Sequence, residues 1–273
     1  MPYDGNAGDS LIQLATARLL ADLGIHTTAD ARKADLILVP GGNPTMWPGI
    51  GVQRWLEIWR QHPQAELVVG PAGFRTGYSD WPRAIAEHGH RVTGLFARDP
   101  DSFRHLETAA LRPDIRVALS HDPALYLRES EWIRAHRDAA TADYDLHAFR
   151  NDHEANLPSP TRSRAWRLLP GRLRGPAETW LAQRVRTRNS AHARRLAGGD
   201  LPILYRDVSR EGFDVFTEVI RAARTVHTDR LHVMLLAAML GKTVFAYATS
   251  HAKLEGAYRH SLAGWADVRL VAP

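Results

Sequence analysis

The residues best suited to chemistry lie in the stretch Thr228-Asp229-Arg230-Leu231-His232, which combines a cation, a carboxylate and a titratable imidazole. The apolar stretch Val233–Leu240 follows directly, so a short strand should give way to a helix here. Open α/β sheets bind ligands at such points, and a helix N-terminus attracts anions. Because Arg230 and His232 flank Leu231, their side chains can converge on one ligand. We therefore predict an anion site in which His232 acts as a proton donor.

Other strand-like runs also end in polar residues that suit an anion. Arg150 follows an apolar strand, and its planar fork matches a carboxylate or a phosphate. The alternative for Arg150 is a structural ion pair with Asp152. Ser250 and Lys253 follow the strand-like Thr243–Ala248 and would bring a hydroxyl and an ammonium group to the same edge of the sheet. For Lys253 the alternative is a solvated side chain.

Small residues precede the first helical pattern of the chain, which runs from Ser10 to Leu23. The backbone around Asn6, Gly8 and Asp9 can face an anion or sugar oxygens at this helix start. An N-cap at Asp9 or Ser10 explains the pattern equally well. Almost nothing precedes this loop, so either the sheet lacks a first strand or the sequence begins upstream of the first residue given.

A second group of small and polar residues follows strands of the first half. Gly41, Gly42 and Asn43 come directly after an apolar run, where a sharply turning backbone can approach a ligand. A plain strand-to-helix turn is the alternative. Asp122 ends a further strand and suits an inter-domain hydrogen bond or a substrate contact. Arg98, at another strand end, is interpreted as structural.

The elements that must position these residues alternate along the chain. Continuous apolar runs interleaved with amphipathic stretches are typical of α/β proteins with mostly parallel sheets covered on both faces. We predict two Rossmann-like domains, one over residues 1–125 and one over residues 126–273, the second carrying a basic insertion at 156–199. The predicted strands are 35–39, 66–70, 93–97, 116–119, 144–149, 201–205, 225–227 and 243–248.

Positive charge is concentrated in one segment. Residues 162–195 contain ten arginines and one acidic residue, a local charge of +9. Such a block favours an anionic partner, which can be a phosphorylated substrate, an anionic lipid surface or a nucleic acid. A solvated, arginine-rich helix is the alternative. Because only Trp166 and Trp180 offer stacking there, we do not expect a nucleic-acid partner.

Composition removes several other classes of chemistry. The chain has no cysteine, which excludes disulfides, thiolate catalysis and cysteine-ligated zinc. The histidines show no metal-ligand spacing, so no metal is predicted. Since no apolar run approaches the roughly 18 to 20 residues of a membrane span and the N-terminus lacks signal-peptide features, we expect a cytoplasmic protein.

Taken together, these stretches resemble the polysaccharide pyruvyltransferase family. The resemblance runs in order over most of the chain, leaves 156–199 unmatched and is most specific from Thr228 to Lys253. The stretches that carry it are Gly5–Ile12, Pro40–Gly42, Phe96–Ser102, Asp122–Leu125, Phe149–Asp152 and Val226–His232 through Lys253.

The resemblance implies a GT-B-type pair of domains, with phosphoenolpyruvate as co-substrate, no further cofactor, and a sugar with two suitable hydroxyls as acceptor. The product would be a pyruvate ketal. By position, Arg150 and Arg230 match the family's donor-binding arginines, His232 matches its proposed catalytic acid, and the backbone at Leu231 helps to hold the donor. The C-terminal domain would be the donor side. The N-terminal domain would be the acceptor side, where Asn43 replaces a third glycine of the family pattern.

Two other functions stay open at this point. One is a glycosyltransferase that uses a nucleotide sugar on a similar fold, because a fold does not fix a function. The other is a noncatalytic anion-binding or nucleic-acid-binding protein that uses residues 162–195. As a separate hypothesis, the segment 156–199 docks the enzyme on the anionic inner face of the cell membrane, where lipid-diphosphate-linked glycan acceptors are assembled.

Overall fold

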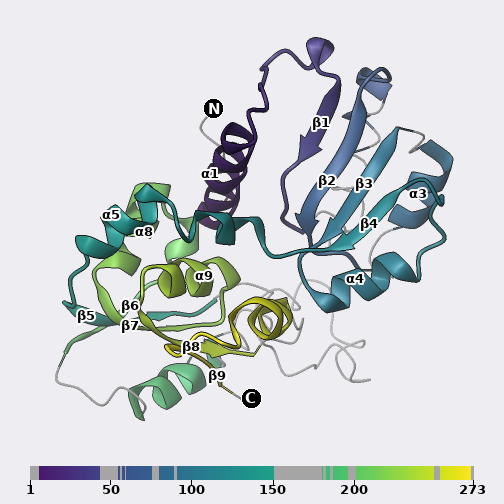
Figure 1. The fold of residues 1–273 in the computed structure, drawn as a ribbon. Helices are drawn as coiled ribbons and strands as arrows, with labels where there is room; N and C mark the ends of the chain where they lie inside the picture. Colours follow the sequence, from purple (N-terminus) through teal and green to yellow (C-terminus); the bar gives the residue numbers. More distant parts are fainter. Residues whose placement is uncertain are drawn as a thin grey trace, which may run out of the picture. The chain divides into compact units, whose positions relative to one another are not determined.

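The computed structural model describes residues 6–43, 55–75, 80–88, 91–150, 180–195, 201–248 and 253–271, apart from 56, 59, 181–182 and 185–186. The chain divides into two compact units. The N-terminal unit is Leu11–Leu127, and the C-terminal unit combines Met1–Ser10 with Arg128–Pro273. Each unit is built around one sheet whose described strands are all parallel (Figure 1). The predicted α/β class with two mostly parallel sheets is confirmed.

The sheet of the N-terminal unit follows the order of the sequence, β1-β2-β3-β4. Its strands are β1 (Leu36–Val39), β2 (Glu66–Ala72), β3 (Val92–Ala97) and β4 (Arg116–Leu119). Their apolar side chains pack with α3 (Trp81–His88) and α4 (Pro100–Glu107) in one core cluster. The described strands of this sheet therefore contain no reversal of order. The unit also holds η1 (Ala31–Lys33) and η2 (Pro123–Leu127).

Helix α1 (Ala7–Asp22) begins earlier than the sequence suggests. The side-chain oxygen of Asn6 accepts a hydrogen bond from the backbone N–H of Gly8 at 2.9 Å and from that of Asp9 at 3.3 Å. Asn6 is therefore the N-cap, and the expectation that Asp9 or Ser10 caps a helix starting at Ser10 is wrong. The physical reason is that asparagine satisfies the first N–H groups while the small residues after it continue the helix.

The sheet of the C-terminal unit has the order β6-β5-β7-β8-β9. Its first strand in the sequence, β5, lies between β6 and β7, so the chain reverses its direction of progress across the sheet at this strand. The strands are β5 (Tyr144–Ala148), β6 (Ile203–Tyr205), β7 (Ala223–Thr228), β8 (Thr243–Tyr247) and β9 (Val268–Val271). Such a topological switch point is where open α/β sheets hold ligands.

Helices cover both faces of this sheet. Figure 1 shows α5, α8 and α9 on one side and the helical residues 187–195 on the other. The helices are α5 (Glu131–Asp138), α8 (Phe213–Arg221), α9 (Leu231–Met239) and α10 (Lys253–Ala257), with η4 (Val208–Arg210) and the π-helical turn η5 (Tyr258–Leu262). Every residue from Val233 to Met239 is buried, so α9 is the central helix of the unit.

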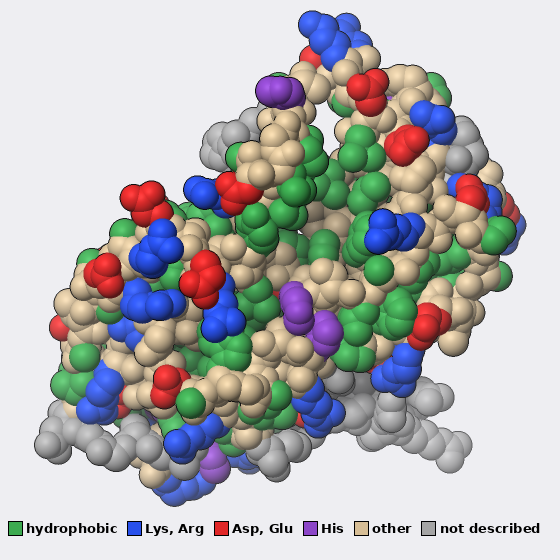
Figure 2. All heavy atoms as spheres, in the orientation of Figure 1, with side chains coloured by type: hydrophobic (Ala, Val, Ile, Leu, Met, Phe, Trp, Pro, Cys, Tyr) green, Lys and Arg blue, Asp and Glu red, His purple; other side chains and the backbone are tan. Residues whose placement is uncertain are grey.

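The outer surface carries charges of both signs. Figure 2 shows acidic and basic side chains interspersed over α5 and α8, as in the pair of Arg221 with Glu218, whose Nε and Oε2 atoms lie 2.9 Å apart. Mixed charge of this kind is typical of a solvated face. Among the described residues, no helix is both long and apolar enough to span a bilayer.

A row of rings crosses the face of the C-terminal sheet that residues 187–195 cover. Tyr205, His147, His227 and Phe245 stand at matching positions on neighbouring strands. Their ring centroids are 5.0, 4.9 and 4.8 Å apart in this order. Burial lowers the pKa of His147 to about 4 and that of His227 to about 3. Both imidazoles are therefore neutral at pH 7.

This row predicts a loss of stability in acid. Because the folded-state pKa values lie below the ordinary 6.5, the unfolded chain binds more protons as the pH falls from about 6.5 to about 4. Each histidine should then lower the free energy of unfolding by up to about 1.4 kcal/mol per pH unit in this window.

His147→Phe tests this expectation, because neither ring nitrogen of His147 has a hydrogen-bond partner among the described residues. The variant should keep its stability at pH 7 and show a shallower loss between pH 6.5 and 4 in urea unfolding. His26→Phe, at an exposed position, is the control and should leave the slope unchanged. Equal slopes in wild type and His147→Phe would contradict the prediction.

Candidate functional site

The candidate site lies at the carboxyl ends of β5 and β7, the two strands at the switch point. Ala148 and Thr228 pair in register, and Thr228 Oγ1 donates a hydrogen bond to the carbonyl of Ala148 at 2.8 Å. The same hydroxyl accepts the backbone N–H of Arg230 at 3.0 Å. The backbone N–H of Arg150 donates to Asp229 Oδ1 at 2.8 Å. These bonds fix the points at which Arg150 and Arg230 leave adjacent strands.

Asp229 is the buried carboxylate between these two exits. It is 2% exposed, and burial raises its pKa to about 6. The N–H of Arg150 and the charges of Arg230 and Arg150 oppose this rise. Since the raised pKa still lies below neutrality, Asp229 is mostly ionised at pH 7 and can hold the Arg150 backbone by a charge-assisted bond.

The guanidinium of Arg230 is held by a carboxylate from the third strand at this edge. Its Nη2 pairs with Asp207 Oδ2, and the two side chains are 10% and 11% exposed. Asp207 Oδ1 accepts hydrogen bonds from the backbone N–H of Ser209 at 3.4 Å and from its hydroxyl at 2.9 Å. Asp207 is thus fixed at the start of η4 and orients Arg230. The sequence analysis missed Asp207, although its position directly after a strand is a signal that was available.

Arg230 is also the N-cap residue of α9, and Leu231 and His232 form its first turn. The side chain of Arg230 makes no capping hydrogen bond, so the first N–H groups of α9 and the positive end of its dipole face the same edge. His232 lies against Gly8 of α1, which belongs to the same unit. The structure therefore brings together Arg150, Arg230, Leu231 and His232, as the sequence predicted, and adds the first turn of α1 to them.

The remaining predicted donor residues are less well placed by the structure. Lys253 begins α10 and is half-buried. Ser250 lies outside the described residues, so its role stays a prediction. Within the described part of the chain, no three histidine or acidic side chains converge as a metal site would require. Asn6 and Asp9, predicted on the acceptor side, stand in the capped turn of α1, where Asn6 Nδ2 donates to Asp9 Oδ2 at 2.9 Å.

The glycine loop of the N-terminal unit is shaped by the end of β2. Gly41 and Gly42 have φ values of +36° and +87°, in the left-handed region that favours glycine. A Cβ on Gly41 would lie 2.9 Å from the carbonyl oxygen of Pro71. The carbonyl of Gly42 accepts the N–H of Gly73 at 2.8 Å. Backbone geometry at the sheet edge therefore accounts for both glycines.

Asn43 and Asp122 are joined in the same unit by Arg98. Its Nη2 donates to Asn43 Oδ1 at 2.7 Å, and its Nη1 donates to Asp122 Oδ2 at 3.0 Å. Asp122 Oδ1 accepts the N–H of Ala124 at 3.1 Å. Arg98 and Asp122 are each 1% exposed, so each charge needs the other, which agrees with a structural role for Arg98. A contact of Asn43 or Asp122 with an acceptor stays a prediction.

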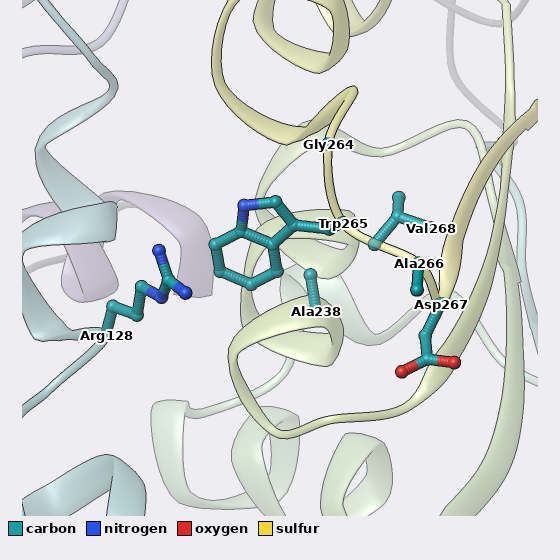
Figure 3. Close-up of a pocket in the computed structure, with 7 residues that line it drawn as sticks. All are labelled: Arg128, Ala238, Gly264, Trp265, Ala266, Asp267 and Val268. Atoms are coloured by element: carbon teal, nitrogen blue, oxygen red, sulfur yellow. The ribbon is translucent and has the colours of Figure 1, made fainter.

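A small pocket of the C-terminal unit lies at the other edge of the sheet. Figure 3 shows the guanidinium of Arg128 facing the indole of Trp265, while the carboxylate of Asp267 lies apart from this pair. The distance from Arg128 Cζ to the ring centroid is 4.4 Å. Asp267 precedes β9, and its carbonyl accepts the N–H of Val244 near the start of β8. The pocket is therefore at the amino edge and does not belong to the candidate site.

Comparison with solved structures supports the fold. A functionally uncharacterised protein from Klebsiella pneumoniae subsp. pneumoniae NTUH-K2044 superposes with a TM-score of 0.60 at 18% identity, covering 100% of this chain and 91% of that one. The UDP-GlcNAc 2-epimerase of Methanocaldococcus jannaschii gives 0.40 at 14% identity, over 97% of this chain and 71% of that one. The UDP-forming α,α-trehalose-phosphate synthase of Burkholderia vietnamiensis gives 0.45 at 13% identity, over 98% and 65%.

Comparison with sequences supports a family. No curated protein matches the sequence significantly. The family model for polysaccharide pyruvyl transferase matches residues 6–251, a range that includes the ends of β5 and β7 and the start of α9. The chain therefore belongs to the polysaccharide pyruvyl transferase family.

Proposed function

We propose that the protein transfers a pyruvyl group from phosphoenolpyruvate to a sugar of a polysaccharide or lipid-linked glycan and forms a pyruvate ketal. The observation that carries this proposal is that Arg150, Arg230 and His232 leave the carboxyl edge of the sheet at its switch point. Two guanidinium groups suit a small molecule with a carboxylate and a phosphate. Family membership supports pyruvyl transfer to a polysaccharide over other uses of such a site.

The chemistry follows from the groups at this edge. His232 protonates the methylene carbon of phosphoenolpyruvate, and the carbon that bears the phosphate becomes oxocarbenium-like. A sugar hydroxyl adds to this carbon, and a second hydroxyl then displaces inorganic phosphate. Of the two hydroxyl protons, one balances the new methyl group and the other leaves with phosphate. Arg150 and Arg230 neutralise the carboxylate and phosphate of the donor throughout.

The acceptor side and the membrane remain separate proposals. We assign the glycan to the N-terminal unit, with Gly41, Gly42 and Asn43 as its candidate contacts. We also propose that the basic segment 156–199, most of which lies outside the described residues, contacts anionic lipid. Co-sedimentation with phosphatidylcholine vesicles should then increase when phosphatidylserine is added, and binding that ignores lipid charge would exclude this contact.

Donor binding and turnover can be separated in one experiment. At about 100 times its dissociation constant, phosphoenolpyruvate should raise the melting temperature of the wild type by roughly 5 to 10 °C. His232→Ala should keep most of this rise but lose about 10²- to 10⁴-fold in phosphate release with a glycan acceptor, because only the proton donor is missing.

UDP-sugars are the matched ligands for the alternative function. They should leave the melting temperature unchanged, and a rise with a UDP-sugar but none with phosphoenolpyruvate would replace pyruvyl transfer by glycosyl transfer. Full turnover in His232→Ala would remove the imidazole from the mechanism. Product mass identifies the ketal directly.

Asp207 should act through Arg230. Asp207→Ala leaves the buried guanidinium without the carboxylate that orients it, so kcat/KM for phosphoenolpyruvate should fall by about 10²-fold, mainly through KM. Asp207→Asn keeps an oxygen acceptor and should retain most of the activity. Asp214→Ala, an exposed aspartate of α8, is the control. If Asp207→Ala leaves KM unchanged, Asp207 does not position the donor site.

A further inference from the structure

The first turn of α1 packs directly on the imidazole of His232. A Cβ placed on Gly8 would lie 2.1 Å from Nδ1 of His232, 2.6 Å from Cγ and 2.8 Å from Cβ. Carbon atoms that are not bonded pack best at about 3.5 to 4.0 Å, so these positions cannot hold a methyl group and the ring together. The contact extends to the base of the His232 side chain, where the ring cannot simply swing aside.

Helix propensity works against a glycine at this position. Gly8 is helical, and a glycine within a helix is less favourable than alanine by roughly 0.5 to 1 kcal/mol. The described glycines with positive φ are Gly24, Gly41, Gly42 and Gly241, so backbone conformation does not require glycine at position 8. The close approach to His232 is the physical reason that remains.

The surface that meets the imidazole is itself held in place. Asn6 accepts the N–H of Gly8 and donates its amide to Asp9, each at 2.9 Å. Ala7, Leu11 and Ile12 of the same helix are buried, at 2%, 0% and 2% exposure. The first turn of α1 is therefore a fixed wall rather than a loose end of the chain.

We infer that Gly8 is a positioning residue for His232, because the bare backbone of the first turn of α1 sets the orientation in which the imidazole faces the donor. This inference rests on the proposed role of His232 as proton donor. It gives Gly8 a role beside the donor instead of the acceptor contact expected from the sequence. The contact joins two residues of the C-terminal unit.

A double-mutant cycle tests the contact without any assay of activity. Gly8→Ala should lower the melting temperature of the wild type by roughly 2 to 10 °C through overpacking. In the His232→Ala background the methyl group has room, so the same substitution should leave the melting temperature unchanged or raise it through helix propensity. Gly264→Ala is the control, since a Cβ there meets nothing within 4 Å.

Two further readouts separate positioning from mere packing. The imidazole NMR signals of His232, assigned by their loss in His232→Ala, should shift in Gly8→Ala and not in Gly264→Ala. Turnover of Gly8→Ala should fall about 100-fold, while phosphoenolpyruvate still raises its melting temperature. If the wild type shows no pyruvyl transfer, the proposed function fails, but the cycle and the NMR signals still decide the contact.

Several outcomes would overturn the inference. One is an equal loss of melting temperature from Gly8→Ala in both backgrounds, and another is no loss in the wild type. Unchanged imidazole signals or unchanged turnover in Gly8→Ala would do so as well. If Gly8→Ala alone does not fold, the double variant is compared with His232→Ala, and a double variant that also fails to fold would contradict the predicted relief.

Discussion

The buried carboxylate of Asp229 is the charge that ties the donor edge together. It accepts the N–H of Arg150 at 2.8 Å and lies next to Arg230 in the sequence, so one negative group holds the exits of β5 and β7 and offsets two cations. Burial raises its pKa only to about 6, which keeps it mostly ionised at neutral pH. With Asp207 on Arg230, the two arginines are kept close without a ligand, and their remaining N–H groups stay available to an anion.

The order of the strands explains why this edge and not another carries the site. In the C-terminal sheet β5 has β6 on one side and β7 on the other, so the loops that follow these strands diverge and leave a crevice between them. In the N-terminal sheet the described strands run in sequence order and offer no such point. There the glycines at the end of β1 serve the turn itself. Similar sequence patterns thus have different causes in the two units.

Local pattern was sufficient for much of the fold. The helix Trp81–His88 and the strand Arg116–Leu119 were predicted at their observed limits, because apolar periodicity and the flanking turn residues are encoded nearby. The start of α1 was wrong because Asn6, not Asp9 or Ser10, satisfies its first N–H groups. Strand β9 was not predicted, since Val268-Arg269-Leu270-Val271 is short and gains its place only by pairing with β8.

The candidate site shows the same division between local and distant information. Arg150, Arg230 and His232 stand at ends of elements, and a single sequence reveals such positions. Asp207 and Gly8 acquire their roles only through partners far along the chain, at Arg230 and His232, which no local periodicity encodes. The arginines therefore depend on hydrogen bonds within one sheet, whereas the imidazole depends on a helix from the other end of the chain. Anion binding can accordingly survive a disturbance of α1 that removes the proton donor from its place.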